Sequence, residues 1–194
     1  MKKHQPWNRN IALLAVIRAA FAALFVVPVI TLYWKRYGMD IFDIFVLQAI
    51  FALFVVILEI PTGFLADHLG RKRTLILATV TATLGWGCYA IADSFPLFVL
   101  FELLLGSAFS LLSGTDSSML YESLSAAGRS GEFTKISGHQ ESLTHLAEGG
   151  AALVGGLAAT FLALEWLFVM TAVAALIALL AATALTEPPR GRGY

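Results

Sequence analysis

The chain has 194 residues, of which 58% are hydrophobic and 13% are charged, and its formal net charge is zero. Because soluble domains carry about 25% charged residues, this composition argues against a soluble domain and favours a membrane protein, while the neutral balance gives no reason to expect a nucleic-acid partner. The single cysteine, Cys88, excludes an internal disulfide and a metal site made of several cysteines.

Six long apolar runs predict six membrane-spanning helices and an all-α membrane protein. Residues 74–92 and 166–186 contain no charge, and each run can cross the hydrocarbon core, about 30 Å thick, as a helix. Strands are disfavoured because the runs are too long, and because only helices or closed barrels satisfy the backbone in lipid. The expected helices cover residues 11–34, 41–66, 74–92, 96–123, 136–163 and 166–185.

The first run contains an arginine, Arg18. The start Met-Lys-Lys followed by an apolar run resembles a signal peptide, but the run extends past twenty residues and Arg18 interrupts it, so we expect a permanent helix. At about 1.5 Å per residue, Arg18 lies about 12 Å from the inner surface. An arginine at that depth costs at least about 2.5 kcal/mol and needs an acidic partner in the bundle interior.

Residues 63–75, Gly-Phe-Leu-Ala-Asp-His-Leu-Gly-Arg-Lys-Arg-Thr-Leu, place a dense group of charges between the second and third runs. A basic cytoplasmic loop would fix the topology by itself, but this leaves Asp67, Gly63 and Gly70 unexplained. Asp67 and Arg71 are four residues apart, so a helical turn would bring them within pairing distance. The glycines allow a tight turn and close backbone approach.

This stretch resembles the loop between the second and third helices of the major facilitator superfamily, whose pattern is G-x-L-A-D-R-x-G-R-K-x-x-L. His68 departs from the pattern, because the family prefers Arg there. Residues 59–63, 113–116 and 120–123 are similar to segments of bacterial members, and the similarity follows the whole chain in order and spacing. The matching loop residues are Gly63, Leu65, Ala66, Asp67, Gly70, Arg71, Lys72 and Leu75.

The resemblance implies the N-terminal six-helix half of a transporter, with a gate at this loop. By resemblance, Asp67 and Arg71 form a charge cluster with Glu122 at the inner end of the fourth helix. The cluster then docks on the other half of the transporter in the outward-open state. The gating residues implied by the resemblance are Gly63, Asp67, Gly70, Arg71, Lys72 and Glu122.

The fourth run carries two acids that can pair with Arg18. Asp116 lies about 10 Å deep by the same helical rise, which matches Arg18, so it is the first choice, and Glu102, near the outer end, is the second. Such a pair either locks two helices together or belongs to a transport path, and intramembrane charges favour the path. Many family members have an Arg four residues before Gly106, where this chain has Glu102; the role of that Arg is absent or has moved to Arg18.

The fifth run places Glu141, His145 and Glu148 on one helical face, because they are spaced by four and three residues. His145 can change its charge near neutral pH. A metal site is an alternative interpretation, but the trio matches no recognised metal motif, and we expect no metal. The pairs at 149–150 and 155–156 are glycines that allow close helix approach; they match only partly the Gly-Pro-x-x-Gly-Gly pattern of antiporter members.

The distribution of lysine and arginine predicts a multi-pass protein of the cell inner (plasma) membrane with both termini cytoplasmic. Only Lys35 and Arg36 lie on the outer side, and the loop 124–135 is expected to be cytoplasmic. Short connections near Asp93 and Glu165 make the third and fourth, and the fifth and sixth, helices antiparallel neighbours within one domain, residues 1–194. The cytoplasmic cations are Lys2, Lys3, Arg9, Arg71, Lys72, Arg73, Arg129, Lys135, Arg190 and Arg192.

These features predict a secondary active transporter that moves a small organic solute by alternating access, with the proton as the favoured coupling ion. Two copies would supply both halves as a homodimer; the chain is alternatively an N-terminal fragment of a twelve-helix transporter, or a non-transporting membrane scaffold. No cofactor or catalytic residue is expected, since the serines of the fourth helix lack a histidine base at similar depth. The expected pathway residues are Arg18, Glu102, Asp116, Glu141, His145 and Glu148.

Overall fold

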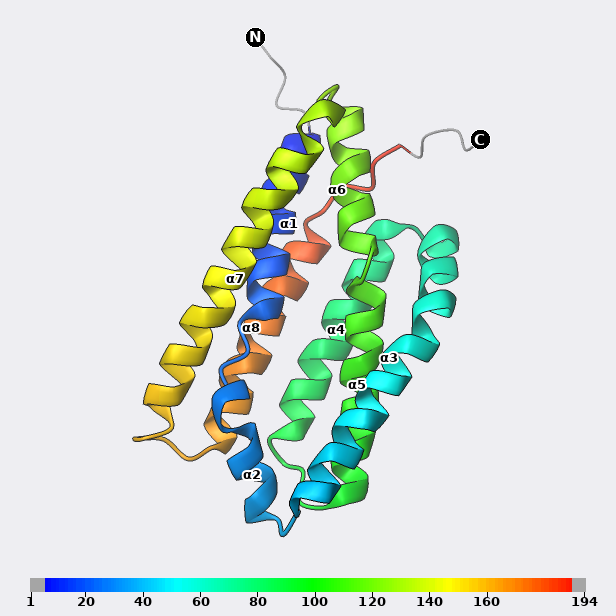
Figure 1. Ribbon diagram of the computed structural model, residues 1–194. Coiled ribbons are helices and arrows are strands. Elements are labelled where there is room, and N and C mark those ends of the chain that lie inside the picture. The colour runs from blue at the N-terminus through cyan, green and yellow to red at the C-terminus, as the bar shows by residue number, and fades with distance from the viewer. Residues whose placement is uncertain (1–5, 190–194) are drawn as a thin grey trace.

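The computed structural model describes residues 6–189, and within these residues the secondary structure consists of helices joined by short connections (Figure 1). The all-α prediction is confirmed for this part of the chain. Lys2, Lys3, Arg190 and Arg192 lie outside the described residues. The elements are α1 (Pro6–Ala22), η1 (Val27–Val29), α2 (Ile30–Arg36), α3 (Ile41–Leu69), α4 (Arg71–Tyr89), α5 (Phe95–Leu112), α6 (Thr115–Ala126), η2 (Ser130–Glu132), α7 (Phe133–Ala158) and α8 (Glu165–Thr183).

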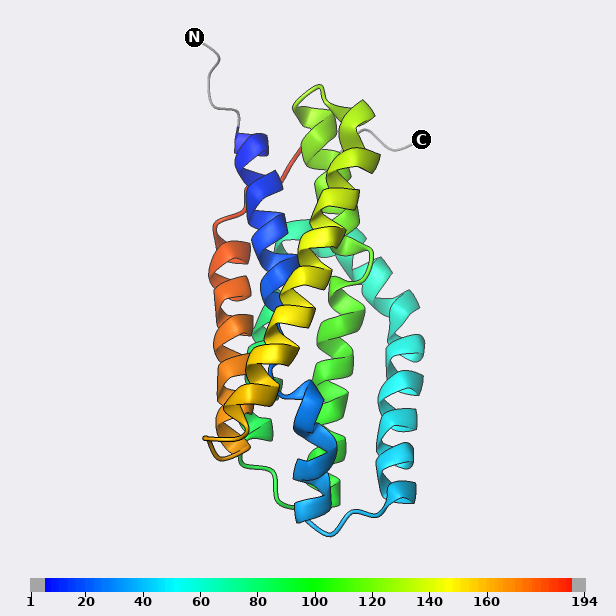
Figure 2. The ribbon, with the colours of Figure 1, turned by 60° about the vertical axis from the view of Figure 1, so that its left-hand side comes forward.

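The helices form a bundle of elongated rods that run in roughly one direction (Figures 1 and 2). Helices α1 and α2 are successive segments of one rod, α5 and α6 form another, and α3, α4, α7 and α8 complete the bundle. The start of α1, the end of α8 and the connection from α6 to α7 lie at the same end of the bundle (Figure 1).

Four of these rods are long and apolar enough to cross a membrane: α1 with α2, α3, α5 with α6, and α8. The prediction of six apolar spans is therefore confirmed for four. Helix α4 begins at Arg71 and so includes the three cations Arg71, Lys72 and Arg73, and the first half of α7 is rich in polar residues. The sequence prediction began the third span at residue 74, after these cations, and thereby overestimated how apolar the complete helix is.

Two expected spans are discontinuous, which the sequence analysis did not predict. In residues 11–34 the helix stops at Ala22 and resumes at Ile30, and the intervening segment contains Pro28, which has no amide hydrogen to continue the helix. In residues 96–123 the helix breaks at Gly114, whose φ of 72° lies in the left-handed region, a backbone conformation that glycine adopts at little energetic cost. Helix α6 then continues to Ala126, into the segment 124–135 expected as a loop.

Helix α8 packs through a face of small side chains. Helix α1 contacts α6, α7 and α8, and α4 packs between α5 and α8, while α3 packs mainly on α5. Small residues let helices approach closely in lipid, where burial of apolar area gives little driving force. Helix α7 has its main contact with α1, so the expected direct pairing of α7 with α8 does not describe the packing. The small buried residues of α8 are Ala174, Ala175, Ala178, Ala181 and Ala182.

The break between α1 and α2 rests on a glycine of α7. A Cβ atom added at Gly155 would clash with the backbone carbonyl of Phe25, whereas Gly156 next to it faces open space. Close approach of the two backbones therefore requires glycine at position 155 alone. This contact fixes the unwound segment at one wall of the cavity described below.

Candidate functional site

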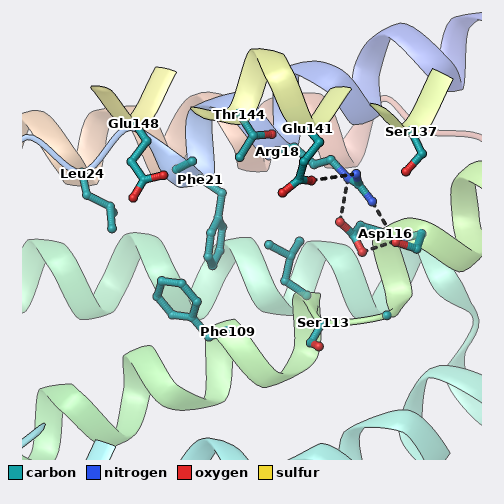
Figure 3. A pocket seen from close by; sticks show the side chains of 14 residues that line it. Arg18, Phe21, Leu24, Phe109, Ser113, Asp116, Ser137, Glu141, Thr144 and Glu148 are labelled. Atoms are coloured by element: carbon teal, nitrogen blue, oxygen red, sulfur yellow. Dashed lines mark hydrogen bonds and ion pairs between the residues drawn. The ribbon is translucent and has the colours of Figure 1, made fainter. Parts of the chain in front are cut away.

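A cavity of about 470 Å³ lies between α1, the α5–α6 break and α7 (Figure 3). We call it the Arg18 cavity. Its walls include both helix breaks, through Leu24 on one side and Ser113 with Gly114 on the other. Charged side chains reach it from three helices: Arg18 from α1, Asp116 from α6, and Glu141 and Glu148 from α7 (Figure 3).

Arg18 is paired with Asp116, the partner predicted from their matching depths. Its Nε atom lies 2.7 Å from Asp116 Oδ2, although its N–H is not aimed well enough to count as a hydrogen bond, so the contact is an ion pair. Arg18 Nη2 donates a hydrogen bond of 2.8 Å to Ser117 Oγ. Glu102, the second choice, does not form an ion pair with Arg18, and Ser117 was missed because serine carries no charge signal.

Asp116 occupies a position that favours a carboxylate. It is the second residue of α6, so the break at Gly114 creates a helix N-terminus inside the protein. The partial positive charge of that terminus attracts an anion, and Asp116 Oδ1 accepts a hydrogen bond of 2.6 Å from the backbone N–H of Ser117. The helix break thus helps to place an acid opposite Arg18.

The three titratable residues of α7 lie on one face, as their spacing predicts. Glu141 Oε2 lies 3.8 Å from Arg18 Nη1, and Glu148 lines the same cavity farther along the helix (Figure 3). His145 sits between the acids, with its ring nitrogens 3.5 Å from Glu141 and 3.4 Å from Glu148, and it is not among the residues that line the cavity. Among the described residues, no group of three His, Cys, Asp or Glu side chains is arranged to hold a metal ion.

Glu102 lines a separate cavity of about 370 Å³, which we call the Glu102 cavity. The side chain is only 5% exposed, and its Oε1 accepts a hydrogen bond of 3.1 Å from Tyr89 Oη. Tyr89 Oη in turn accepts a hydrogen bond of 2.7 Å from Trp34 Nε1. Sequence reasoning missed this aromatic network, because residues 34, 89 and 102 belong to three different helices and share no periodicity.

Phenylalanine rings separate the two cavities. Phe109 and Leu24 line both of them. The ring of Phe109 meets Phe21 edge-on at 5.0 Å and Phe51 edge-on at 5.7 Å between centroids. Figure 3 shows Phe21 and Phe109 facing each other beside the charged end of the Arg18 cavity. Phe109, with Phe21 on one side and Phe51 on the other, therefore lies in the wall that the two cavities share.

The loop motif forms the charge cluster that the resemblance implied. Arg71 Nη1 donates a hydrogen bond of 2.6 Å to Asp67 Oδ1, and its Nε lies 3.5 Å from Glu122 Oε1. Gly70 joins α3 to α4 with a φ of 97°, which only glycine adopts readily. Gly63 lines a small pocket together with Asp67 and Arg71, and Lys72 follows Arg71 in α4. The gating roles of all six residues remain predictions.

Glu187 is a member of this region that the sequence analysis missed. Its two carboxylate oxygens accept hydrogen bonds of 2.8 Å from the backbone N–H groups of Arg71 and Lys72, at the start of α4. An acid at a helix N-terminus satisfies amides that have no partner within the helix. The segment after α8 is also held by Asn10, whose side chain bonds both the N–H and the carbonyl of Thr186.

Comparison with known protein families identifies one that covers almost the whole chain. The model of the family described as Major Facilitator Superfamily matches residues 11–193. The matched region contains the loop motif, both cavities and all four apolar spans in full or nearly in full. Members of this family are transporters rather than enzymes. The chain therefore belongs to the Major Facilitator Superfamily and is a multi-pass membrane protein of the transporter type.

Proposed function

We propose that the protein is a secondary active transporter that moves a small organic solute by alternating access, using the proton as its coupling ion. The observation that carries the proposal is the Arg18–Asp116 ion pair in the wall of a cavity bounded by two broken helices. Discontinuous helices and intramembrane charges commonly mark substrate and ion sites in transporters. All six rods, α4 and α7 included, cross the inner membrane in this proposal, and both termini are cytoplasmic.

Proton coupling is supported by the competition of two acids for one cation. Arg18 contacts Asp116 at 2.7 Å and Glu141 at 3.8 Å, so it lies between carboxylates of different helices. Protonation of Asp116 would remove its negative charge and leave Arg18 to pair more closely with Glu141. That exchange would pull α1 and α7 together and release α6, which couples a proton to a change in helix packing.

A second bundle is needed to complete the pathway. Glu141, His145 and Glu148 are each more than half exposed, and exposed charges at membrane depth face a protein interior or water rather than lipid. We propose that a second copy in parallel orientation covers this face, as the two-fold axis of a homodimer allows. The first alternative is a C-terminal half in the same polypeptide. The second alternative is a non-transporting membrane scaffold, but a scaffold would have no use for these charges.

Transport by reconstituted protein tests the proposal. In liposomes with an imposed pH gradient, panels of cationic, neutral and anionic organic solutes should be screened for coupled uptake and proton flux. At least one class should be moved, and Asp116→Asn should abolish coupling while Asp93→Asn, at an exposed turn remote from the cavity, should not. Protein that binds lipid and stays folded yet moves no solute and no protons would favour the scaffold.

A further inference from the structure

We propose that the Glu102 cavity is a binding site for a monovalent organic cation, with Glu102 as its counter-ion. If the protein is the transporter proposed above, such a cation is the class of solute that it moves. Binding of the cation does not depend on that proposal, because it can be measured without transport. The site lies between α2, α3 and α5, with Trp86 of α4 in its wall. It is separate from the Arg18 cavity and contains none of the four charged residues found there.

Glu102 has no counter-ion within the described part of the chain. A buried carboxylate costs several kcal/mol unless it is paired and hydrogen-bonded. Asp116 meets this need through Arg18, but no Lys, Arg or His among residues 6–189 comes within 4.0 Å of Glu102, and none lines its cavity. The cavity therefore contains a buried carboxyl group for which the described part of the chain supplies no cation.

Hydrogen bonds hold the carboxyl group of Glu102 in a fixed position. Indole nitrogen can only donate, so Tyr89 Oη must accept from Trp34 Nε1 and direct its own hydrogen to Glu102. The phenol of Tyr33 anchors this end of the bundle by donating a hydrogen bond of 3.0 Å to the carbonyl of Ala92. Trp34, Tyr33 and Tyr89 are almost fully buried. A carboxylate fixed by a donor chain is already oriented for a ligand.

The walls of the Glu102 cavity are mainly apolar, with a few polar groups. Apart from Glu102, the polar side chains that line the cavity are Thr31, Gln48 and the indole of Trp34. The other lining residues comprise three aromatic rings, Trp86, Phe51 and Phe109, and five aliphatic side chains, Leu24, Val27, Ile30, Ile44 and Leu105. Aromatic faces attract cations, and a volume of about 370 Å³ falls within the range of small-molecule sites. The combination disfavours an anion and favours a cation with an apolar body, such as an amine or a quaternary ammonium.

Direct binding tests the site. Tritiated benzyltrimethylammonium should bind saturably to the full chain in lipid nanodiscs, and phenylacetate should not compete. Glu102→Gln should weaken binding by at least about tenfold, whereas Glu132→Gln, the same change at an exposed position in the connection from α6 to α7, should leave it within about twofold. Glu102→Asp should retain binding, and Trp86→Phe should bind better than Trp86→Leu, since phenylalanine keeps an aromatic face.

The outcomes separate this inference from the transport proposal. Equal affinity of folded wild-type protein and Glu102→Gln, or no saturable binding of the cation, overturns the cation site even if neutral or anionic solutes are transported. Binding that depends on Glu102 in protein that transports nothing supports the site and counts against the transporter. If Glu102→Gln fails to fold, the Glu102→Asp and Trp86 variants decide the question. The site is contradicted if Trp86→Phe and Trp86→Leu both bind the cation as well as the wild type does.

Discussion

At the scale of single residues, Arg18 is the cation that balances the acidic side chains around the Arg18 cavity. It is 8% exposed and bonds Asp116 and Ser117 while lying near Glu141. An ion pair at this burial does not by itself stabilise a protein, because desolvation offsets attraction. Removal of one partner is nevertheless costly, because the remaining charge is left buried and unpaired.

We therefore predict that Arg18→Ala destabilises the protein by about 3–5 kcal/mol and abolishes transport. The double variant Arg18→Ala with Asp116→Asn should recover most of the stability, because it leaves no unpaired buried charge at this position, but should remain inactive. Thermal unfolding in detergent and expression level measure the first effect. Failure of the double variant to recover would show that the two side chains are not energetically coupled.

Depth along a helix was enough to predict that Arg18 meets Asp116, because both positions follow from a constant rise per residue. It was not enough for Glu102, whose partners Tyr89 and Trp34 are uncharged and come from helices whose rotation is set by packing. Glu187 was missed for a related reason: nothing in the local sequence shows that the segment after α8 returns to the start of α4.

At the scale of the elements, the breaks in the helices place functional groups in the wall of the cavity. Gly114 gives α6 its own N-terminus beside Asp116, and the segment between α1 and α2 crosses Gly155 of α7. The sequence predicted helices in the correct order but as continuous rods, since the first run stays apolar through its break and the polar residues 113–118 of the fourth run are also compatible with a helix. Periodicity and hydropathy detect apolar residues, and they do not register a local change of backbone direction.

Gly155→Ala is predicted to destabilise the protein by about 1–3 kcal/mol, because the new methyl group clashes with the carbonyl of Phe25 and separates α7 from the break. Gly156→Ala is the matched control: a Cβ there meets nothing within 4 Å, and alanine favours helix. Unfolding midpoints of the two variants in the same detergent provide the measurement. Equal midpoints would refute the requirement for close approach at position 155.

At the scale of the whole molecule, the exposed surfaces divide into two kinds. Helix α3 presents large apolar side chains, such as Ile60 and Phe42, whereas α7 presents Glu141, His145 and Glu148. Lipid accommodates the first surface, and the second requires a protein partner or water. The loop cluster at the end of α3 leaves Asp67 64% exposed, so it is available to a second bundle.

We predict that Asp67→Asn leaves assembly intact but slows transport and shifts the carrier toward the inward-open state, because the charge that favours the outward-open contact is lost. Asp93→Asn removes the same charge from an exposed position at the opposite end and should have little effect. Initial uptake rates in liposomes and cross-linked dimer yield measure the two properties. A variant that transports as fast as wild type would remove Asp67 from the gate.

The central claim is that the Arg18 cavity opens to each side of the membrane in turn, and labelling of one cavity residue tests it most directly. In a Cys88→Ser background, Thr144→Cys in the cavity wall should react with an impermeant maleimide in both right-side-out and inverted vesicles. Lys135→Cys should react only from the cytoplasmic side, and Ala178→Cys, which is fully buried, should react from neither. Labelling of position 144 from a single side only, in folded protein, would contradict alternating access.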